Sequence, residues 1–179
     1  MTEHAGFKVG LKVFLFWVFF LALYGLYKAF PIFPFSIFCG TDESNFQHYK
    51  ATFFTLMILN VVEYIAHRKQ ISRPAEFWHV RMLVATFAPW MVFLLWYLAP
   101  AIHGVKMPNI PMEIIYSNII TILVGFYAVT IERHFGQNRF SPSLKFITYS
   151  LFGISILLYM VFTFSHLPWA DVFIEADWR

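Results

Sequence analysis

Charged residues are scarce in this chain: Asp, Glu, Lys and Arg make up 13% of its 179 residues. Soluble domains carry about 25% charged residues, so this composition excludes an ordinary water-exposed surface. Cysteine occurs once, as Cys39, which excludes an intrachain disulfide and a cage of thiolate metal ligands. The net charge of +3 does not indicate nucleic-acid binding, because no basic stripe alternates with aromatic residues.

Hydrophobic residues make up 59% of the chain and gather in five long runs. Each run is close to the roughly 20 residues that a helix needs to cross a bilayer. Such runs must be helical in lipid, which offers no partners to backbone N–H and C=O groups. The sequence therefore predicts an all-α, polytopic membrane protein with a single domain over residues 1–179. Its five transmembrane helices are expected at residues 11–30, 45–66, 82–102, 112–131 and 144–164.

The distribution of Lys and Arg predicts the orientation in the membrane. Nine of the 13 basic residues lie at one set of predicted helix ends, and the other set holds Lys28, Lys50, Lys106 and Arg179. Cytoplasmic loops are the ones enriched in Lys and Arg. We therefore predict a multi-pass protein of the cell membrane, most simply the cytoplasmic membrane of a prokaryote, with its N-terminus inside and its C-terminus outside.

Two local patterns mark the ends of predicted spans. Ser44 and Gln47 have the spacing of a capping box, which predicts the start of the second helix. Lys12 and Lys28 stand near the ends of the first span, where we expect their ammonium groups to snorkel toward water.

Polar residues gather at the predicted outer end. Glu43 and His48 accompany the start of the second helix, and His166 and Asp171 follow the last one. Histidine with carboxylates can bind zinc, iron or manganese, so these four residues form a candidate outer polar site. Glu43, His48 and His166 are the candidate ligands of a divalent metal. A solvated acidic rim beside a helix N-terminus accounts for the same pattern.

Two further candidates lie inside the second span, Asn60 and Glu63. A charged side chain within a span costs about 2.5–3.5 kcal/mol at the bilayer centre, so Glu63 must have a partner or a function. His67 and Arg68 are close to it in the sequence. A structural salt bridge and a proton relay are both open for this carboxylate.

The stretch "TDESNFQHYKATFFTLMILNVVEY" resembles a pattern in a family of small bacterial integral membrane proteins without an assigned activity: N-E-S-x-W-E-H-L-K, then an apolar span and E-Y. That family ends its last helix with P-H-I-P, where this chain has "SHLPW". The resemblance implies the same membrane architecture over nearly the whole chain. The matching positions are Glu43, Ser44, His48, Lys50, Glu63, His166 and Pro168. The chain departs from the pattern at Asp42, Phe46 and Gln47.

Three classes of function remain open. Short connections, and no phosphate loop, dinucleotide fingerprint or nucleophile motif, favour a small binding or accessory subunit of a membrane complex. Its partners would be the lipid bilayer and other membrane-protein subunits, with no nucleic acid. The alternatives are a membrane-embedded enzyme with a His/carboxylate site, and a small-solute or proton-coupled transporter that uses Asn60 and Glu63.

Overall fold

The computed structural model describes residues 6–104, 109–136, 138–167 and 169–174. These residues form α-helices and one short 3-10 helix, which confirms the prediction of an all-helical chain. The elements are α1 (Val9–Ala29), α2 (Phe33–Phe38), α3 (Asn45–His67), α4 (Pro74–His103), α5 (Ile110–Phe135), α6 (Pro142–Phe164) and η1 (Asp171–Phe173).

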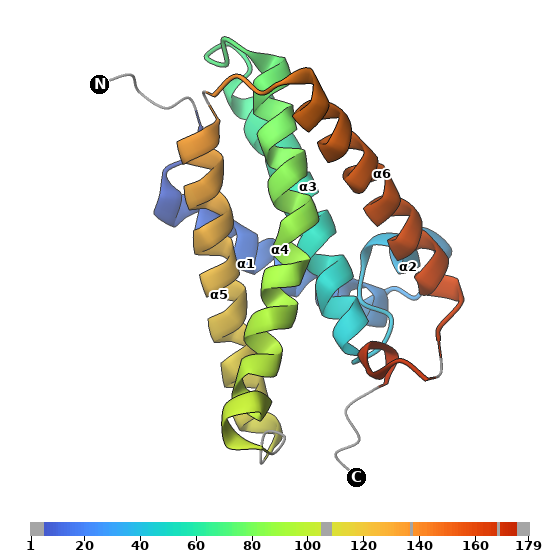
Figure 1. Ribbon diagram of the computed structural model, residues 1–179. Helices are drawn as coiled ribbons and strands as arrows, with labels where there is room; N and C mark the ends of the chain where they lie inside the picture. The colour runs from blue at the N-terminus through green and yellow to red at the C-terminus, as the bar shows by residue number, and fades with distance from the viewer. Residues whose placement is uncertain (1–5, 105–108, 137, 168, 175–179) are drawn as a thin grey trace.

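The long helices pack as one bundle in which α4 contacts α3, α5 and α6. Figure 1 shows α1 passing behind α4 and α5 toward α2, and it shows α3, α4, α5 and α6 running between two ends of the molecule. We call the end that holds α2, η1 and the start of α3 the α2 end. The opposite end, which holds the α3–α4 turn and the start of α6, is the α3–α4 end.

Four of the helices, α1, α4, α5 and α6, are long and apolar enough to cross a membrane. Their outward faces carry large apolar side chains such as Leu94, Phe146 and Leu157, which are 66%, 72% and 63% exposed. Surfaces of this kind are costly in water and favourable in lipid. These features indicate a multi-pass membrane protein.

Helix α3 is not among those four, and its burial explains why. Its polar residues include Gln47, Lys50, Asn60 and Glu63, and all of them are buried. The helix lies between α1 and α4, and its apolar residues Phe53, Leu56 and Leu59 belong to the core. Because neighbouring helices rather than lipid surround much of α3, its side chains need not be uniformly apolar.

Two helices extend further than the hydrophobic runs predicted. Helix α4 begins at Pro74 rather than at residue 82, and α5 ends at Phe135 rather than at residue 131. The added turns carry His79, Arg81 and Glu132, which are buried in the protein. Arg81 and Glu132 continue these helices near the span ends because they find charged partners inside the bundle.

The predicted capping box is wrong in its chemistry, although α3 does begin after Ser44. The Ser44 side chain does not cap α3, and the Gln47 amide donates to Thr41 and Asp42 instead. The Asp42 carboxylate accepts from the Ser44 N–H at 2.8 Å. An aspartate two residues upstream therefore orders the entry to the helix.

Candidate functional site

The four residues of the predicted outer polar site all lie at the α2 end, but each has different partners. Glu43 is exposed and accepts hydrogen bonds from the Tyr24 hydroxyl, at 2.5 Å, and from the Lys28 ammonium. Partial burial favours the neutral carboxyl, but the bonds from Lys28 and Tyr24 outweigh it and hold the pKa of Glu43 below its usual range. Glu43 therefore joins the start of α3 to the end of α1.

His166 and Asp171 make their contacts elsewhere at this end. The His166 ring is exposed and stacks on Phe173, with centroids 5.5 Å apart. Asp171 accepts a hydrogen bond from the Tyr97 hydroxyl of α4 at 2.5 Å. Among the described residues, no group of three or more His, Cys, Asp or Glu could hold a metal ion. The structure does not assemble Glu43, His48 and His166 into the metal site considered above.

His48 lies instead within a stack of aromatic rings. Its imidazole is 4.6 Å from the Tyr24 ring and 6.2 Å from the Trp96 ring, with interplanar angles of 18° and 20°. Offset stacking of this kind contributes about 0.5–1.5 kcal/mol per pair beyond burial. The stack links α1, α3 and α4, so contacts from rings on two neighbouring helices fix the position of the His48 ring.

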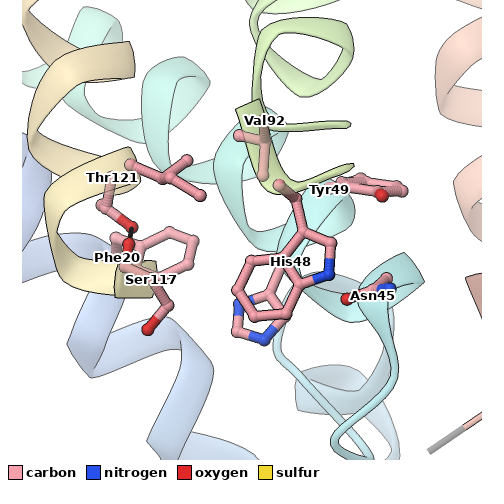
Figure 2. A pocket seen from close by; sticks show the side chains of 9 residues that line it. Phe20, Asn45, His48, Tyr49, Val92, Ser117 and Thr121 are labelled. Carbon is pink, nitrogen blue, oxygen red and sulfur yellow. Dashed lines mark hydrogen bonds between the residues drawn. The ribbon is translucent and has the colours of Figure 1, made fainter. Parts of the chain in front are cut away.

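A narrow pocket of about 10 Å³, enough for about one water molecule, adjoins His48. Figure 2 shows Ser117 and Thr121 of α5 on one side and His48 with Asn45 on the other. The lining combines aromatic and aliphatic surface with a few polar groups. Its residues are Phe20, Asn45, His48, Tyr49, Val92, Trp96, Ser117, Ile120 and Thr121.

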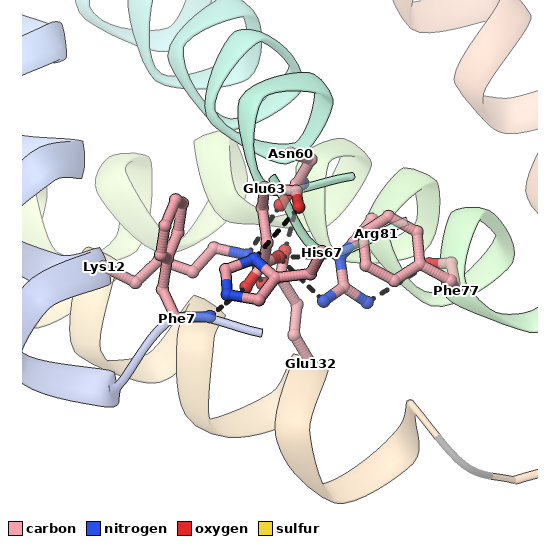
Figure 3. Close-up of polar contacts among 8 residues, drawn as sticks. All are labelled: Phe7, Lys12, Asn60, Glu63, His67, Phe77, Arg81 and Glu132. Atoms are coloured by element: carbon pink, nitrogen blue, oxygen red, sulfur yellow. Dashed lines mark hydrogen bonds and ion pairs between the residues drawn. The ribbon is translucent and has the colours of Figure 1, made fainter. Parts of the chain in front are cut away.

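A second polar assembly lies inside the bundle toward the α3–α4 end, and Lys12 is its centre (Figure 3). The Lys12 ammonium donates to Asn60 Oδ1 at 2.7 Å, to Glu63 Oε2 at 2.6 Å and to Glu132 Oε2 at 2.5 Å. Asn60 also donates to Glu132 Oε1 at 3.1 Å. An ammonium has three N–H donors, so every donor of Lys12 has an acceptor.

Arg81 completes this buried ionic cluster, which consists of Lys12, Asn60, Glu63, Arg81 and Glu132. The guanidinium binds Glu63 Oε2 through Nη2 at 2.8 Å and Nε at 3.1 Å. The five side chains are at most 6% exposed. Two cations face two carboxylates, so the charges balance, as buried charges require.

The start of the chain covers one side of the buried ionic cluster. The Phe7 N–H donates to Glu63 Oε1 at 3.0 Å, and the Phe7 ring meets His67 edge-on at 5.0 Å. Gly6 has a φ of +149°, and a Cβ at this position would lie 2.7 Å from Glu63 Oε1. Glycine is therefore required where the backbone approaches the carboxylate.

The sequence identified Asn60 and Glu63 but missed three of their partners. Lys12 does not snorkel, because it is buried and bound within the cluster. Glu63 pairs with Lys12 and Arg81 rather than with His67 and Arg68, although His67 Nδ1 does lie 3.2 Å from the Glu63 carbonyl oxygen.

Lys50 is a second buried lysine, located at the α2 end. It is 0% exposed and donates to the Ser36 carbonyl at 2.9 Å and to the Thr163 hydroxyl at 3.2 Å. These bonds join α3 to α2 and α6. Within the described residues no carboxylate forms an ion pair with it.

A partly buried ion pair joins α4 to α6. Lys145 forms an ion pair with Glu76 at 2.6 Å, and His79 lies one turn further along α4. The His79 ring is 0% exposed and contacts the rings of Phe140 and Tyr149 at 4.6 and 5.7 Å. Glu76 and His79 have the E-x-x-H spacing of some metal-ligand pairs, but no third His, Cys, Asp or Glu among the described residues completes a metal site with them.

No family model, curated protein or solved structure matches this chain. The resemblance to the bacterial membrane family therefore stays a prediction. Of its matching positions, Pro168 lies outside the described residues, as do Lys106 and Arg179 from the charge comparison. The function has to be inferred from the geometry of the pocket and of the buried ionic cluster.

Proposed function

We propose that the chain crosses the membrane five times, with α3 as the fifth span and the α3–α4 end in the cytoplasm. Two observations support this orientation. The polar residues of α3 are enclosed by other helices, so its composition does not prevent it from spanning. Most basic residues of the chain belong to the α3–α4 end.

Cysteine labelling tests the orientation directly. Cys39 is buried and can be replaced by Ser to give a background without thiols. In this background, Trp169→Cys should react with a membrane-impermeant maleimide on intact cells, because residue 169 is 79% exposed at the α2 end. Lys69→Cys should react only after permeabilisation. The reverse pattern would contradict the proposed orientation.

We further propose that the protein is a small membrane-embedded binding protein, an accessory subunit that presents its α2 end to a partner or ligand. The pocket beside His48 is the observation that carries this proposal. Four helices contribute to its lining, and it places polar groups against a rigid aromatic wall.

Recovery of partners from membranes tests the binding function. Affinity-tagged wild type and the double variant Glu43→Gln, His48→Ala would be solubilised in the same mild detergent. The double variant should remain folded, with some loss of stability because the His48 stack and the Glu43 contacts are removed, and should lose most of the co-purifying subunits. His134→Ala is the matched control, because His134 is exposed at the opposite end. Equal recovery from all three proteins would contradict the proposal.

Proton-coupled transport is the second candidate, and the sharing of Lys12 between two carboxylates favours it. Glu63 Oε2 and Glu132 Oε2 both bind the same ammonium, so protonation of either carboxylate would leave the cluster with a net positive charge. In proteoliposomes, Glu63→Gln should then abolish the proton flux that a pH gradient drives across the membrane. Lys28→Gln should leave this proton flux intact. A flux that persists in Glu63→Gln excludes Glu63 as the carrier.

A further inference from the structure

Several exposed cations lie at the α3–α4 end. Within the described ranges none of them forms an ion pair or a side-chain hydrogen bond. They come from the N-terminal segment, the α3–α4 turn and the α5–α6 connection. These residues are Lys8, Arg68, Lys69, Arg73 and Arg139.

The described acidic residues at the same end are already neutralised. Glu63 and Glu132 are 2% exposed and bind Lys12, and Glu63 also binds Arg81. Glu76 is paired with Lys145. The described surface of this end therefore presents positive charge that the described carboxylates do not offset.

Aromatic side chains place the same region at the depth of lipid headgroups. Tyr64 near the end of α3 and Trp78 near the start of α4 have ring centroids 5.2 Å apart, and both are half-buried. Tyr and Trp concentrate at membrane interfaces because their rings are apolar and their tips are polar. The α3–α4 turn, with Arg68, Lys69 and Arg73, lies between these two aromatic positions in the sequence.

We propose that Arg68, Lys69 and Arg73 form a binding surface for the phosphate group of anionic phospholipids, with Lys8 and Arg139 adding to the attraction. Guanidinium and ammonium groups donate to phosphate oxygens, and arginine can do so through two N–H groups at once. The cytoplasmic leaflet is the anionic one, so this inference rests on the proposed orientation. The surface favours phosphatidylglycerol over a zwitterionic lipid of the same chain length.

Lipid retention by the full-length protein in detergent tests this surface without regard to orientation. The protein is mixed with equal amounts of phosphatidylglycerol and phosphatidylcholine, and bound lipid is counted by native mass spectrometry. Wild type should retain phosphatidylglycerol preferentially, and less of it as salt rises. Each of Arg68→Gln, Lys69→Gln and Arg73→Gln should weaken its retention about fivefold.

The controls separate this surface from general charge effects and from free phosphate. Lys28→Gln removes one positive charge at the opposite end, where Lys28 is paired with Glu43, and should leave lipid retention unchanged. Inorganic phosphate at the same concentration as the lipid should not displace phosphatidylglycerol. Equal retention of both lipids, an equal loss in Lys28→Gln, or displacement by inorganic phosphate would overturn the proposal. Because both faces are accessible in detergent, failure here would leave the cysteine-labelling result standing.

Discussion

Lys12 and Glu132 stand 120 residues apart in the sequence and meet inside the bundle, with Nζ and Oε2 separated by 2.5 Å. Both side chains are almost fully withdrawn from solvent. The contact joins the first turn of α1 to the last turns of α5, and through Asn60 and Glu63 it also reaches α3. One ammonium thus fixes the relative positions of three helices.

The Lys12→Met variant should be strongly destabilised. It leaves Glu132 with only the Asn60 amide as a described polar partner and removes one of the two cations beside Glu63. Removing one partner of a buried ion pair costs about 3–5 kcal/mol in the free energy of unfolding. Denaturant unfolding in a fixed detergent, followed by tryptophan fluorescence, measures the loss.

Two further variants test whether burial of the ion pair is the reason for the loss of stability in Lys12→Met. Lys28→Met breaks the exposed pair with Glu43 and should cost less than about 1 kcal/mol. The double variant Lys12→Met, Glu132→Leu removes both charges of one pair and should be more stable than Lys12→Met alone. If Lys12→Met and Lys28→Met lose equal stability, the buried ionic cluster does not stabilise the fold as described.

Gly6→Ala should detach the start of the chain from Glu63. The φ of +149° disfavours alanine, and the new Cβ would lie 2.7 Å from Glu63 Oε1. Strain of this kind costs about 1–3 kcal/mol. Hydrogen exchange at the Phe7 amide, which donates to Glu63, should accelerate. Gly10→Ala is the matched control, because a Cβ there meets nothing within 4 Å, and its exchange at Phe7 should stay at the wild-type rate.

Gly125→Ala should disturb the packing of α5 on α1. A Cβ at residue 125 would lie 2.6 Å from Cδ1 of Phe16, which is itself 0% exposed. Overpacking of a filled core costs about 1–3 kcal/mol. The same substitution at Gly153 of α6 meets open space and should be neutral or slightly stabilising. Thermal unfolding of the two variants side by side checks the difference, and equal midpoints would argue against close packing at Gly125.

The sequence predicted the helices better than it predicted their partners, for a physical reason. Hydrophobic runs report contact with lipid or core, so α6 was expected at 144–164 and lies at Pro142–Phe164. A charged residue near the end of a hydrophobic run does not show whether it is exposed or buried, because either water or a buried counter-ion can solvate its charge. Arg81 and Glu132 were therefore assigned to loops, whereas both are buried in helices.

The candidate site shows the same limit. Glu43, His48, His166 and Asp171 belong to segments at the same end of the bundle, and that this end is the outer one stays a prediction. Which neighbours each residue contacts depends on the rotation and tilt of the helices, and neither can be predicted from a single sequence. Tyr24 and Trp96 have no feature in the sequence that separates them from other aromatic residues of the spans. They contact His48 only because α1 and α4 pack against α3.

The loop between α2 and α3 should loosen in acid through Asp42. Burial favours its neutral form, but hydrogen bonds from Ser44, Gln47 and Thr41 outweigh burial and lower the pKa of the carboxyl from its ordinary value of 3.8. A carboxyl with a depressed folded pKa stabilises the fold above its unfolded pKa, and this contribution is lost as the pH falls through the folded pKa. Protection of the Ser44 amide, corrected for intrinsic exchange, should therefore be constant near neutral pH.

Below the ordinary aspartate pKa, that protection should fall as Asp42 takes up a proton and its bond to the Ser44 N–H, 2.8 Å long, weakens. Asp42→Asn should show weaker protection at neutral pH and lose this acid-dependent step. Glu43→Gln should retain the step, because Glu43 bonds to Tyr24 and Lys28 rather than to the Ser44 amide. If the acid step survives in Asp42→Asn and disappears in Glu43→Gln, the group that titrates is Glu43 and the prediction is wrong. The start of α3 would then be held by the contact of Glu43 with Tyr24 and Lys28 of α1.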